Sequence, residues 1–125
     1  MLEKRTPRPW GAYTVVKTGK GYKVKLVEVS PGKRLSLQRH RYRSEHWTVV
    51  SGIGKITHGT KTLRLKENQG TYIPKNTLHR LENVQKRAKL LVIEVQCGSY
   101  TGEDDIQRYD DDFGRAKKTT KAKKR

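Results

Sequence analysis

The sequence has only one cysteine and no long apolar run. Cys97 cannot form a disulfide within the chain, which excludes a secreted scaffold held together by disulfides. The longest apolar run, at residues 90–93, is far too short to cross a membrane, and the N-terminal segment has no apolar stretch that would serve as a signal peptide. We therefore expect a soluble, cytoplasmic protein without a membrane partner.

Apolar and aromatic residues are also scarce, at 32% and 7% of the chain, and the mean hydropathy is -0.95. Such a composition permits disorder, but the apolar residues fall in short alternating runs separated by turn residues, which is typical of a folded chain. A length of 125 residues suits one domain and excludes larger architectures such as a βα barrel. We expect one compact core.

Acidic residues are few in comparison with basic ones: 12 against 29, for a net charge of +17. Residues 116–125 contain six of the basic residues and no apolar residue except two alanines, so we expect a disordered basic tail after a domain at residues 1–115. The charge favours anionic partners such as phosphate esters or nucleic acid. Nucleic acid binding is the weaker interpretation, because the chain has no stacking pattern or known binding motif.

No stretch longer than ten residues has a convincing helical period. Short runs rich in β-branched and aromatic residues, bounded by glycine and proline, predict strands at residues 13–17, 22–29, 35–40, 45–50, 54–58, 61–66, 71–73 and 89–96. Many short strands separated by turns indicate an all-β barrel or jelly roll. The acidic segment 103–112 is expected to cap this barrel as a short turn or helix.

One set of polar residues has the composition of a metal site. Alternate residues of a strand share a face, so Gln38 and His40 should point the same way. Glu45 opens the next strand, and His79 follows a turn at residues 74–77. Two imidazoles, a carboxylate and an amide oxygen suit a divalent cation, with zinc the first choice and manganese, cobalt, nickel or iron as alternatives. A barrel with hydrogen-bonded histidines and no metal is the other interpretation.

The order of these residues resembles the two sequence motifs of cupins. The residues that match the first motif are Gly32, Gln38, His40, Glu45 and Gly52. Glutamine replaces the usual first histidine of that motif. The residues that match the second motif are Pro74, Lys75, Asn76, His79 and Asn83, with Asn76 where glycine is usual. The resemblance implies a cupin jelly-roll barrel, that is, a double-stranded β-helix.

A narrower resemblance covers almost the whole of residues 8–115. Its segments include Arg-Pro-Trp-Gly at 8–11, Arg-Ser-Glu-His-Trp at 43–47 and His-Arg-Leu-Glu-Asn at 79–83. They resemble the C-terminal cupin domain of type II phosphomannose (mannose-6-phosphate) isomerases, which is often fused behind a mannose-1-phosphate guanylyltransferase. Glutamine at the first ligand position is also usual in that family. Arg41 and Tyr42 stand where the family usually has histidines, which is expected to alter the pocket rim or the metal affinity.

This resemblance implies that the protein interconverts mannose 6-phosphate and fructose 6-phosphate, and that Arg43 and Arg115 are needed for the isomerisation. The reaction would serve GDP-mannose and polysaccharide biosynthesis. The proton transfer between C1 and C2 passes through an enediolate, whose developing oxyanion requires a nearby cation. We expect Arg43 in the turn between His40 and Glu45, at the pocket mouth. Arg115 would have to fold back over the barrel.

A different interpretation is a non-catalytic cupin that binds a sugar phosphate and accompanies a separate nucleotidyltransferase. Guanylyl transfer is not expected, because no nucleotide-binding domain precedes the cupin motifs. Exposed strand edges and an N-terminal arm favour a homodimer. The residue that acts as general base remains open at this point.

Overall fold

The computed structural model describes residues 4–115, so the predicted basic tail at 116–125 lies outside the described residues. The described residues form eleven strands and no helix. The strands are β1 (Arg5–Arg8), β2 (Gly11–Gly19), β3 (Tyr22–Val29), β4 (Leu37–Arg39), β5 (Arg43–Ser51), β6 (Gly54–His58), β7 (Lys61–Leu65), β8 (Gly70–Ile73), β9 (His79–Asn83), β10 (Leu90–Gly98) and β11 (Gln107–Asp110). Within this part of the chain there is thus no helix with the length and apolarity to span a membrane.

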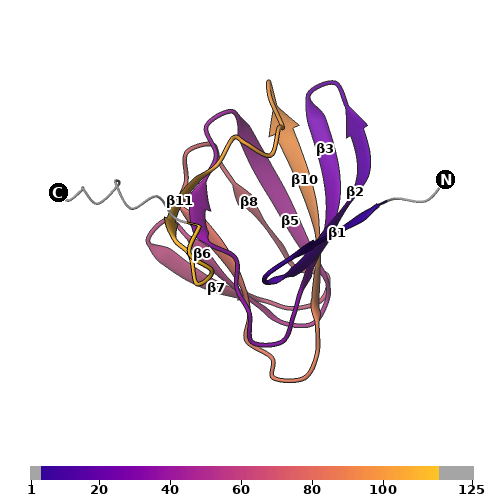
Figure 1. Cartoon of the computed structure of the whole chain (residues 1–125), viewed down its shortest axis with the longest axis vertical. Helices are drawn as coiled ribbons and strands as arrows, with labels where there is room; N and C mark the ends of the chain where they lie inside the picture. The colour runs from indigo at the N-terminus through magenta and orange to yellow at the C-terminus, as the bar shows by residue number, and fades with distance from the viewer. Residues whose placement is uncertain (1–3, 116–125) are drawn as a thin grey trace.

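Two antiparallel sheets face each other and enclose the interior (Figure 1). The first sheet has the order β1-β2-β3-β10-β5-β8, and the second has the order β11-β4-β9-β6-β7. Both sheets join strands from distant parts of the sequence, since β10 lies between β3 and β5 and β11 pairs with β4. The all-β jelly roll predicted from the sequence is confirmed.

The strand predicted at residues 13–17 extends over Gly11–Gly19, β1 was not predicted, and three further local predictions differ from the structure. Of the turn or helix expected for the acidic segment, the structure has a turn at residues 103–104, and Gln107–Asp110 forms β11 instead of a helix because it pairs with the free edge of β4. The predicted strand at residues 35–40 is shorter, since only Leu37–Arg39 is strand. The predicted strand at residues 45–50 begins earlier, at Arg43, because β10 continues to Gly98 and provides backbone partners for Arg43 and Ser44.

The inward faces of the first sheet change from apolar to polar along the barrel. From the apolar to the polar end, the inward residues are Val49, Trp47, Glu45 and Arg43 on β5, and Leu90, Val92, Glu94 and Gln96 on β10. The register places Glu94 opposite Trp47 and Gln96 opposite Glu45, so the polar ends of the two strands coincide. Apolar side chains of both sheets, among them Ile56 and Leu81, fill the other end. One end of the barrel is therefore a closed core, and the other carries buried polar groups.

Candidate functional site

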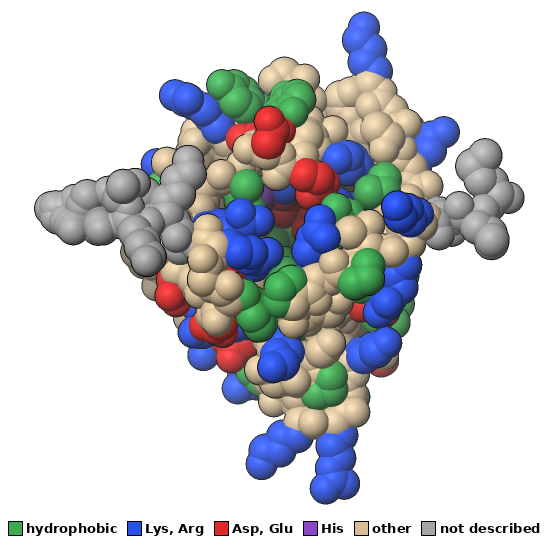
Figure 2. All heavy atoms as spheres, in the orientation of Figure 1, with side chains coloured by type: hydrophobic (Ala, Val, Ile, Leu, Met, Phe, Trp, Pro, Cys, Tyr) green, Lys and Arg blue, Asp and Glu red, His purple; other side chains and the backbone are tan. Residues whose placement is uncertain are grey.

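The polar end of the barrel contains a cavity of about 220 Å³ (Figure 2). Figure 2 shows Lys and Arg side chains around its opening and acidic side chains inside it. Among the lining residues, His40, Glu45 and His79 are each at most 3% exposed, whereas Arg8 is exposed. The cavity therefore has a deeply buried floor of titratable groups and a basic mouth.

Two short backbone contacts hold the histidines of the two motifs side by side. The backbone N–H of Asn76 donates to the carbonyl oxygen of His40 at 2.8 Å, and Gln38 pairs with His79 in the ladder between β4 and β9. Asn76 has a φ of 62°, in the left-handed region that glycine and asparagine adopt most readily. This conformation explains why asparagine replaces the usual glycine of the second motif.

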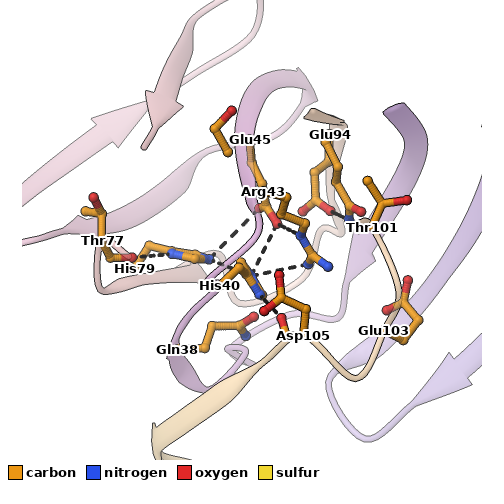
Figure 3. Close-up of polar contacts among 12 residues, drawn as sticks. Gln38, His40, Arg43, Glu45, Thr77, His79, Glu94, Thr101, Glu103 and Asp105 are labelled. Carbon is orange, nitrogen blue, oxygen red and sulfur yellow. Dashed lines mark hydrogen bonds and ion pairs between the residues drawn. The ribbon is translucent and has the colours of Figure 1, made fainter. Parts of the chain in front are cut away.

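The side chains of His40, Glu45 and His79 converge on one point (Figure 3). The two Nε2 atoms are 3.2 Å apart, and Glu45 Oε2 is 3.2 Å from His40 Nε2. The Nδ1 of His40 donates to the carbonyl oxygen of Asp105 at 2.7 Å, and the Nδ1 of His79 donates to that of Thr77 at 2.8 Å. Since a carbonyl only accepts, each Nδ1 carries the proton, and the Nε2 lone pairs are left facing one another.

The protonation of these three groups fits a divalent cation. Burial lowers the pKa of His40 to about 4 and also lowers the pKa of His79. Burial alone would raise the pKa of Glu45, but the adjacent histidines and Arg43 hold it at about 2. Two neutral imidazoles and one carboxylate with convergent lone pairs form a suitable donor set for a borderline divalent ion. The structure thus brings together three of the four predicted metal ligands in a suitable state.

The fourth predicted ligand, Gln38, also lines the cavity and is buried. Its amide nitrogen donates to the hydroxyl of Ser36 at 3.0 Å and to the carbonyl oxygen of Ser36 at 3.3 Å. Because Ser36 engages the nitrogen, the amide oxygen is the Gln38 atom that remains available as a ligand.

Arg43 occupies a different place from the one expected. It is the first residue of β5, 5% exposed, and not part of a turn at the pocket mouth. Its Nε donates to Glu45 Oε2 at 2.8 Å, and its Nη2 lies 3.3 Å from His40 Nε2 (Figure 3). The other oxygen of Glu45 accepts a hydrogen bond of 2.8 Å from Trp47 Nε1. Arg43 is therefore a buried cation on the cavity floor, next to the histidines.

Arg115 lies against the barrel and lines the cavity. Asp111 holds it there, since its carboxylate accepts from the Arg115 backbone N–H at 2.6 Å and from the guanidinium at 2.7 and 3.0 Å. The side chain of Arg115 remains 26% exposed. The structure thus places Arg43 and Arg115, the two arginines that the family resemblance implicates, on the same cavity, one at its floor and one at its mouth.

Glu94 is a cavity residue that was not among the site residues predicted from the sequence. Glu94 lines the cavity, and Gln96 donates to its carboxylate at 2.6 Å. Burial, followed by the charge of Glu45, raises the pKa of Glu94 to about 7. The signal was present in the sequence, because alternation along β10 continues the inward positions of Leu90 and Val92 to Glu94.

Arg41 and Tyr42 are not among the residues that line this cavity, and their expected effect on the metal affinity stays a prediction. Among residues 4–115, both side chains line a separate, more open depression together with Tyr100. Their backbone N–H groups donate to the two carboxylate oxygens of Asp105, each at 2.9 Å. Asp105, which the sequence analysis also missed, therefore fixes this turn with its side chain and His40 with its carbonyl group.

A family profile described as "Mannose-6-phosphate isomerase C-terminal" matches residues 2–111. "Alginate biosynthesis protein AlgA" of Pseudomonas aeruginosa is 55% identical over 108 residues, 86% of this chain and 22% of that protein. "Xanthan biosynthesis protein XanB" of Xanthomonas campestris pv. campestris is 52% identical over 112 residues, 90% of this chain and 24% of that protein. "Mannose-1-phosphate guanylyltransferase RfbM" of Salmonella typhimurium is 45% identical over 113 residues, 90% of this chain and 23% of that protein. The chain spans about a quarter of the length of these relatives.

Solved structures of low sequence identity share the fold. KdgF from Halomonas sp. superposes with a TM-score of 0.72 at 17% identity, covering 81% of this chain and 91% of that chain. A cupin-2 domain, Rru_A2000 from Rhodospirillum rubrum, superposes with a TM-score of 0.63 at 19% identity, covering 75% of this chain and 67% of that chain. These likenesses confirm the predicted cupin barrel. Because the family profile spans both cupin motifs and all eleven described strands, the chain belongs to the mannose-6-phosphate isomerase C-terminal family.

Proposed function

We propose that the protein is a metal-dependent aldose–ketose isomerase that interconverts mannose 6-phosphate and fructose 6-phosphate. The observation that carries this proposal is the convergence of His40, Glu45 and His79 on the floor of a cavity with a basic mouth, in a chain of this family. A pocket with cation ligands and Arg43 on its floor and further arginines in its lining suits a small anionic sugar.

The isomerisation moves a proton between C1 and C2 and places negative charge on a carbonyl oxygen of the substrate. A divalent cation held by His40, Glu45 and His79, with Gln38 as a further ligand, would supply positive charge for that oxygen. Arg43 supplies a second positive charge at the same place, because its guanidinium contacts both Glu45 and His40. Its burial keeps this charge in a fixed orientation before the substrate binds.

Glu94 is the proposed proton-transfer residue. Glu45 is a poor choice, because Arg43 and Trp47 already donate to its two oxygens and hold it ionised. Glu94 lines the same cavity, and its pKa near 7 lets it accept and return a proton near neutral pH. Gln96 fixes the orientation of the Glu94 carboxylate.

The names of the relatives support a role in polysaccharide biosynthesis for the same reaction, since one relative acts in alginate and another in xanthan biosynthesis. We extend the proposal accordingly to the supply of GDP-mannose precursors, in the cytoplasm and as a homodimer. Guanylyl transfer is not part of the proposal, which rests on the cavity of the described residues.

Metal content and turnover of the purified protein test this proposal together. We expect stoichiometric divalent metal, zinc first, by elemental analysis, and formation of fructose 6-phosphate from mannose 6-phosphate in a coupled assay. His79→Ala should lose both, whereas Gln38→His should retain the metal, because imidazole binds such ions better than an amide oxygen does. His46→Ala is the matched control, since His46 is exposed and stacks on Tyr72 outside the cavity. Full metal occupancy in a His40→Ala/His79→Ala variant would contradict the site.

The second candidate is a non-catalytic sugar-phosphate-binding cupin that accompanies a nucleotidyltransferase. The observation in its favour is that two relatives of this chain are named mannose-1-phosphate guanylyltransferases. The metal-loaded wild-type protein distinguishes the two functions. Binding of mannose 6-phosphate in calorimetry without any turnover would favour the second candidate.

A further inference from the structure

Three arginines from distant parts of the chain line the cavity mouth. Arg8 belongs to β1, Arg108 belongs to β11, and Arg115 follows β11. Arg8 is exposed and the other two are partly buried, whereas the proposed metal ligands are deeply buried. The basic side chains around the opening in Figure 2 correspond to this end of the cavity. Besides the buried Arg43, the cavity is thus lined by three arginines that are more exposed than the histidines.

Arg108 has a buried polar atom that the protein leaves without a partner. In the ladder between β11 and β4, Arg108 lies directly opposite Gln38, so both side chains are on the inward face. The Nε of Arg108 is buried and has no hydrogen-bond partner among residues 4–115. A buried donor of a charged group is unfavourable without an acceptor. The missing acceptor is therefore expected to come from a ligand.

The charges around Arg108 do not balance. Burial lowers the pKa of Arg108, and the like charges of Arg115 and Arg8 lower it further. Asp111 is the acidic group that opposes this effect, but both of its oxygens are already bonded to Arg115. Arg8 donates to neutral acceptors, namely Pro7 O at 2.9 Å and Tyr13 Oη at 3.3 Å. Within the described chain, neither Arg8 nor Arg108 forms an ion pair, so the mouth has a surplus of positive charge.

We infer that Arg8, Arg108 and Arg115 form a phosphate-binding site at the cavity mouth, which anchors the substrate by its phosphate and directs its carbonyl end to His40, Glu45 and His79. A phosphate dianion offers several strong acceptors to guanidinium groups and satisfies the buried Nε of Arg108. That the phosphate belongs to a hexose 6-phosphate rests on the proposed function, whereas the anion site rests on the three arginines alone.

The test is calorimetry with two probes, inorganic phosphate and mannose 6-phosphate, on the full chain. Arg108→Gln should weaken the binding of both probes about 10- to 100-fold, the range for loss of a charge-assisted hydrogen bond. Arg39→Gln is the matched control, because Arg39 lies beside Arg108 on the β4–β11 pair but lines the other depression. We expect Arg39→Gln to bind both probes as the wild type does.

Two further variants test whether misfolding of Arg108→Gln, or binding of the anion at the metal, accounts for the result. Arg8→Gln changes an exposed residue and should also weaken both probes, so the inference stays testable if Arg108→Gln fails to fold. His79→Ala, in which the metal site is removed, should still bind inorganic phosphate, because the proposed anchor does not include the metal ligands. Loss of phosphate binding in His79→Ala with wild-type binding in Arg108→Gln and Arg8→Gln would place the anion at the metal and overturn the inference.

Kinetics separate this inference from the proposed function. If the wild type is an isomerase, Arg108→Gln should raise KM in both directions and change kcat by less than about threefold, as expected for an interaction present equally in ground and transition states. If the wild type binds inorganic phosphate through Arg8 and Arg108 but never turns over, the proposed function fails and the anion site stands. An unchanged KM and unchanged phosphate affinity in both variants would refute the anion site alone.

Discussion

Glu45 illustrates how a charge is kept buried at the polar end of the barrel. Each of its oxygens accepts one strong hydrogen bond, from Arg43 on one side and from Trp47 on the other. Loss of one partner would leave a buried carboxylate incompletely satisfied, which is more costly than the hydrogen bond itself is worth. Arg43 therefore stabilises the floor, and in the proposed isomerase it also supplies positive charge next to the substrate.

Replacement of Arg43 by lysine tests the second of these roles. Arg43→Lys keeps the positive charge, but one ammonium cannot reproduce the planar guanidinium that contacts Glu45 and His40 together. We expect kcat to fall about ten- to a thousandfold, the scale of losing one oxyanion partner, with the metal content unchanged. Arg41→Lys, in the adjacent exposed turn, should retain wild-type kcat. Normal turnover with weakened substrate binding in Arg43→Lys would indicate a role in phosphate binding instead.

The raised pKa of Glu94 predicts that its contribution to stability falls as the pH rises. Its folded-state pKa of about 7 exceeds the unfolded value near 4.5, so the folded protein retains a proton that the unfolded chain has released between these pH values. Its contribution to stability is fully present below pH 4.5 and is lost as the pH rises to about 7. For metal-free protein, we expect the free energy of unfolding of the wild type relative to Glu94→Gln to fall by about 3 kcal/mol over that range, measured by urea denaturation.

The prediction compares the free energy of unfolding of the wild type with that of Glu94→Gln. This comparison is needed because the titration of His40 changes stability with pH in the opposite direction. The pKa of His40 is lowered to about 4, so its contribution to stability is lost as the pH falls from 6.5 toward 4. Both proteins retain His40, and its contribution cancels in the difference. A difference that does not vary with pH would show that Glu94 titrates normally.

At the scale of elements, the segment between β10 and β11 supports the cavity through its backbone. The carbonyl oxygen of Gly102 accepts from Arg43 at 3.3 Å, and that of Asp105 accepts from His40 at 2.7 Å. The Asp105 side chain also caps the turn that precedes β5. A connection that resembles a surface loop in sequence thus sets the orientation of one proposed ligand and one proposed catalytic arginine.

Asp105→Ala should reveal this support. The change removes the acceptor of two backbone N–H groups, and we expect a loss of about 1–3 kcal/mol in the free energy of unfolding. Metal affinity should fall about 10- to 100-fold, because the carbonyl that orients His40 is no longer held in place. Asp104→Ala, one residue earlier and exposed, is the control and should leave both quantities near the wild type. Unchanged metal affinity in Asp105→Ala would show that the turn is dispensable for the site.

At the scale of the whole molecule, residues 4–115 contain the eleven described strands and the side chains that line the described cavity. Truncation after Arg115 should therefore leave the melting temperature and the turnover nearly unchanged, although it removes six positive charges. Thermal unfolding and the coupled assay measure the two quantities. A marked loss of either quantity would show that residues 116–125 contribute to the barrel or to the cavity. Arg115→Gln is the comparison variant, because it changes a cavity residue and keeps residues 116–125.

Much of the barrel and the proposed metal centre followed from local patterns in the sequence. Alternation predicted β3 and the hairpin of β6 and β7 closely, because a strand with one buried face repeats every two residues. Alternation along one strand, and the positions of Glu45 and His79 beside turns, predicted the proposed metal ligands Gln38, His40, Glu45 and His79.

Only the tertiary structure decided which side of the protein each remaining polar group faces. Arg43 became a floor residue because β10 extends far enough to pair with it, and Arg108 came to lie opposite Gln38 because β11 pairs with β4 across 70 residues of sequence. The raised pKa of Glu94 also required burial beside Glu45, on a neighbouring strand. Local patterns determine which residues of a strand share a face. Strand order and register determine which residues of different strands come into contact, and both arise from pairings between distant segments of the chain.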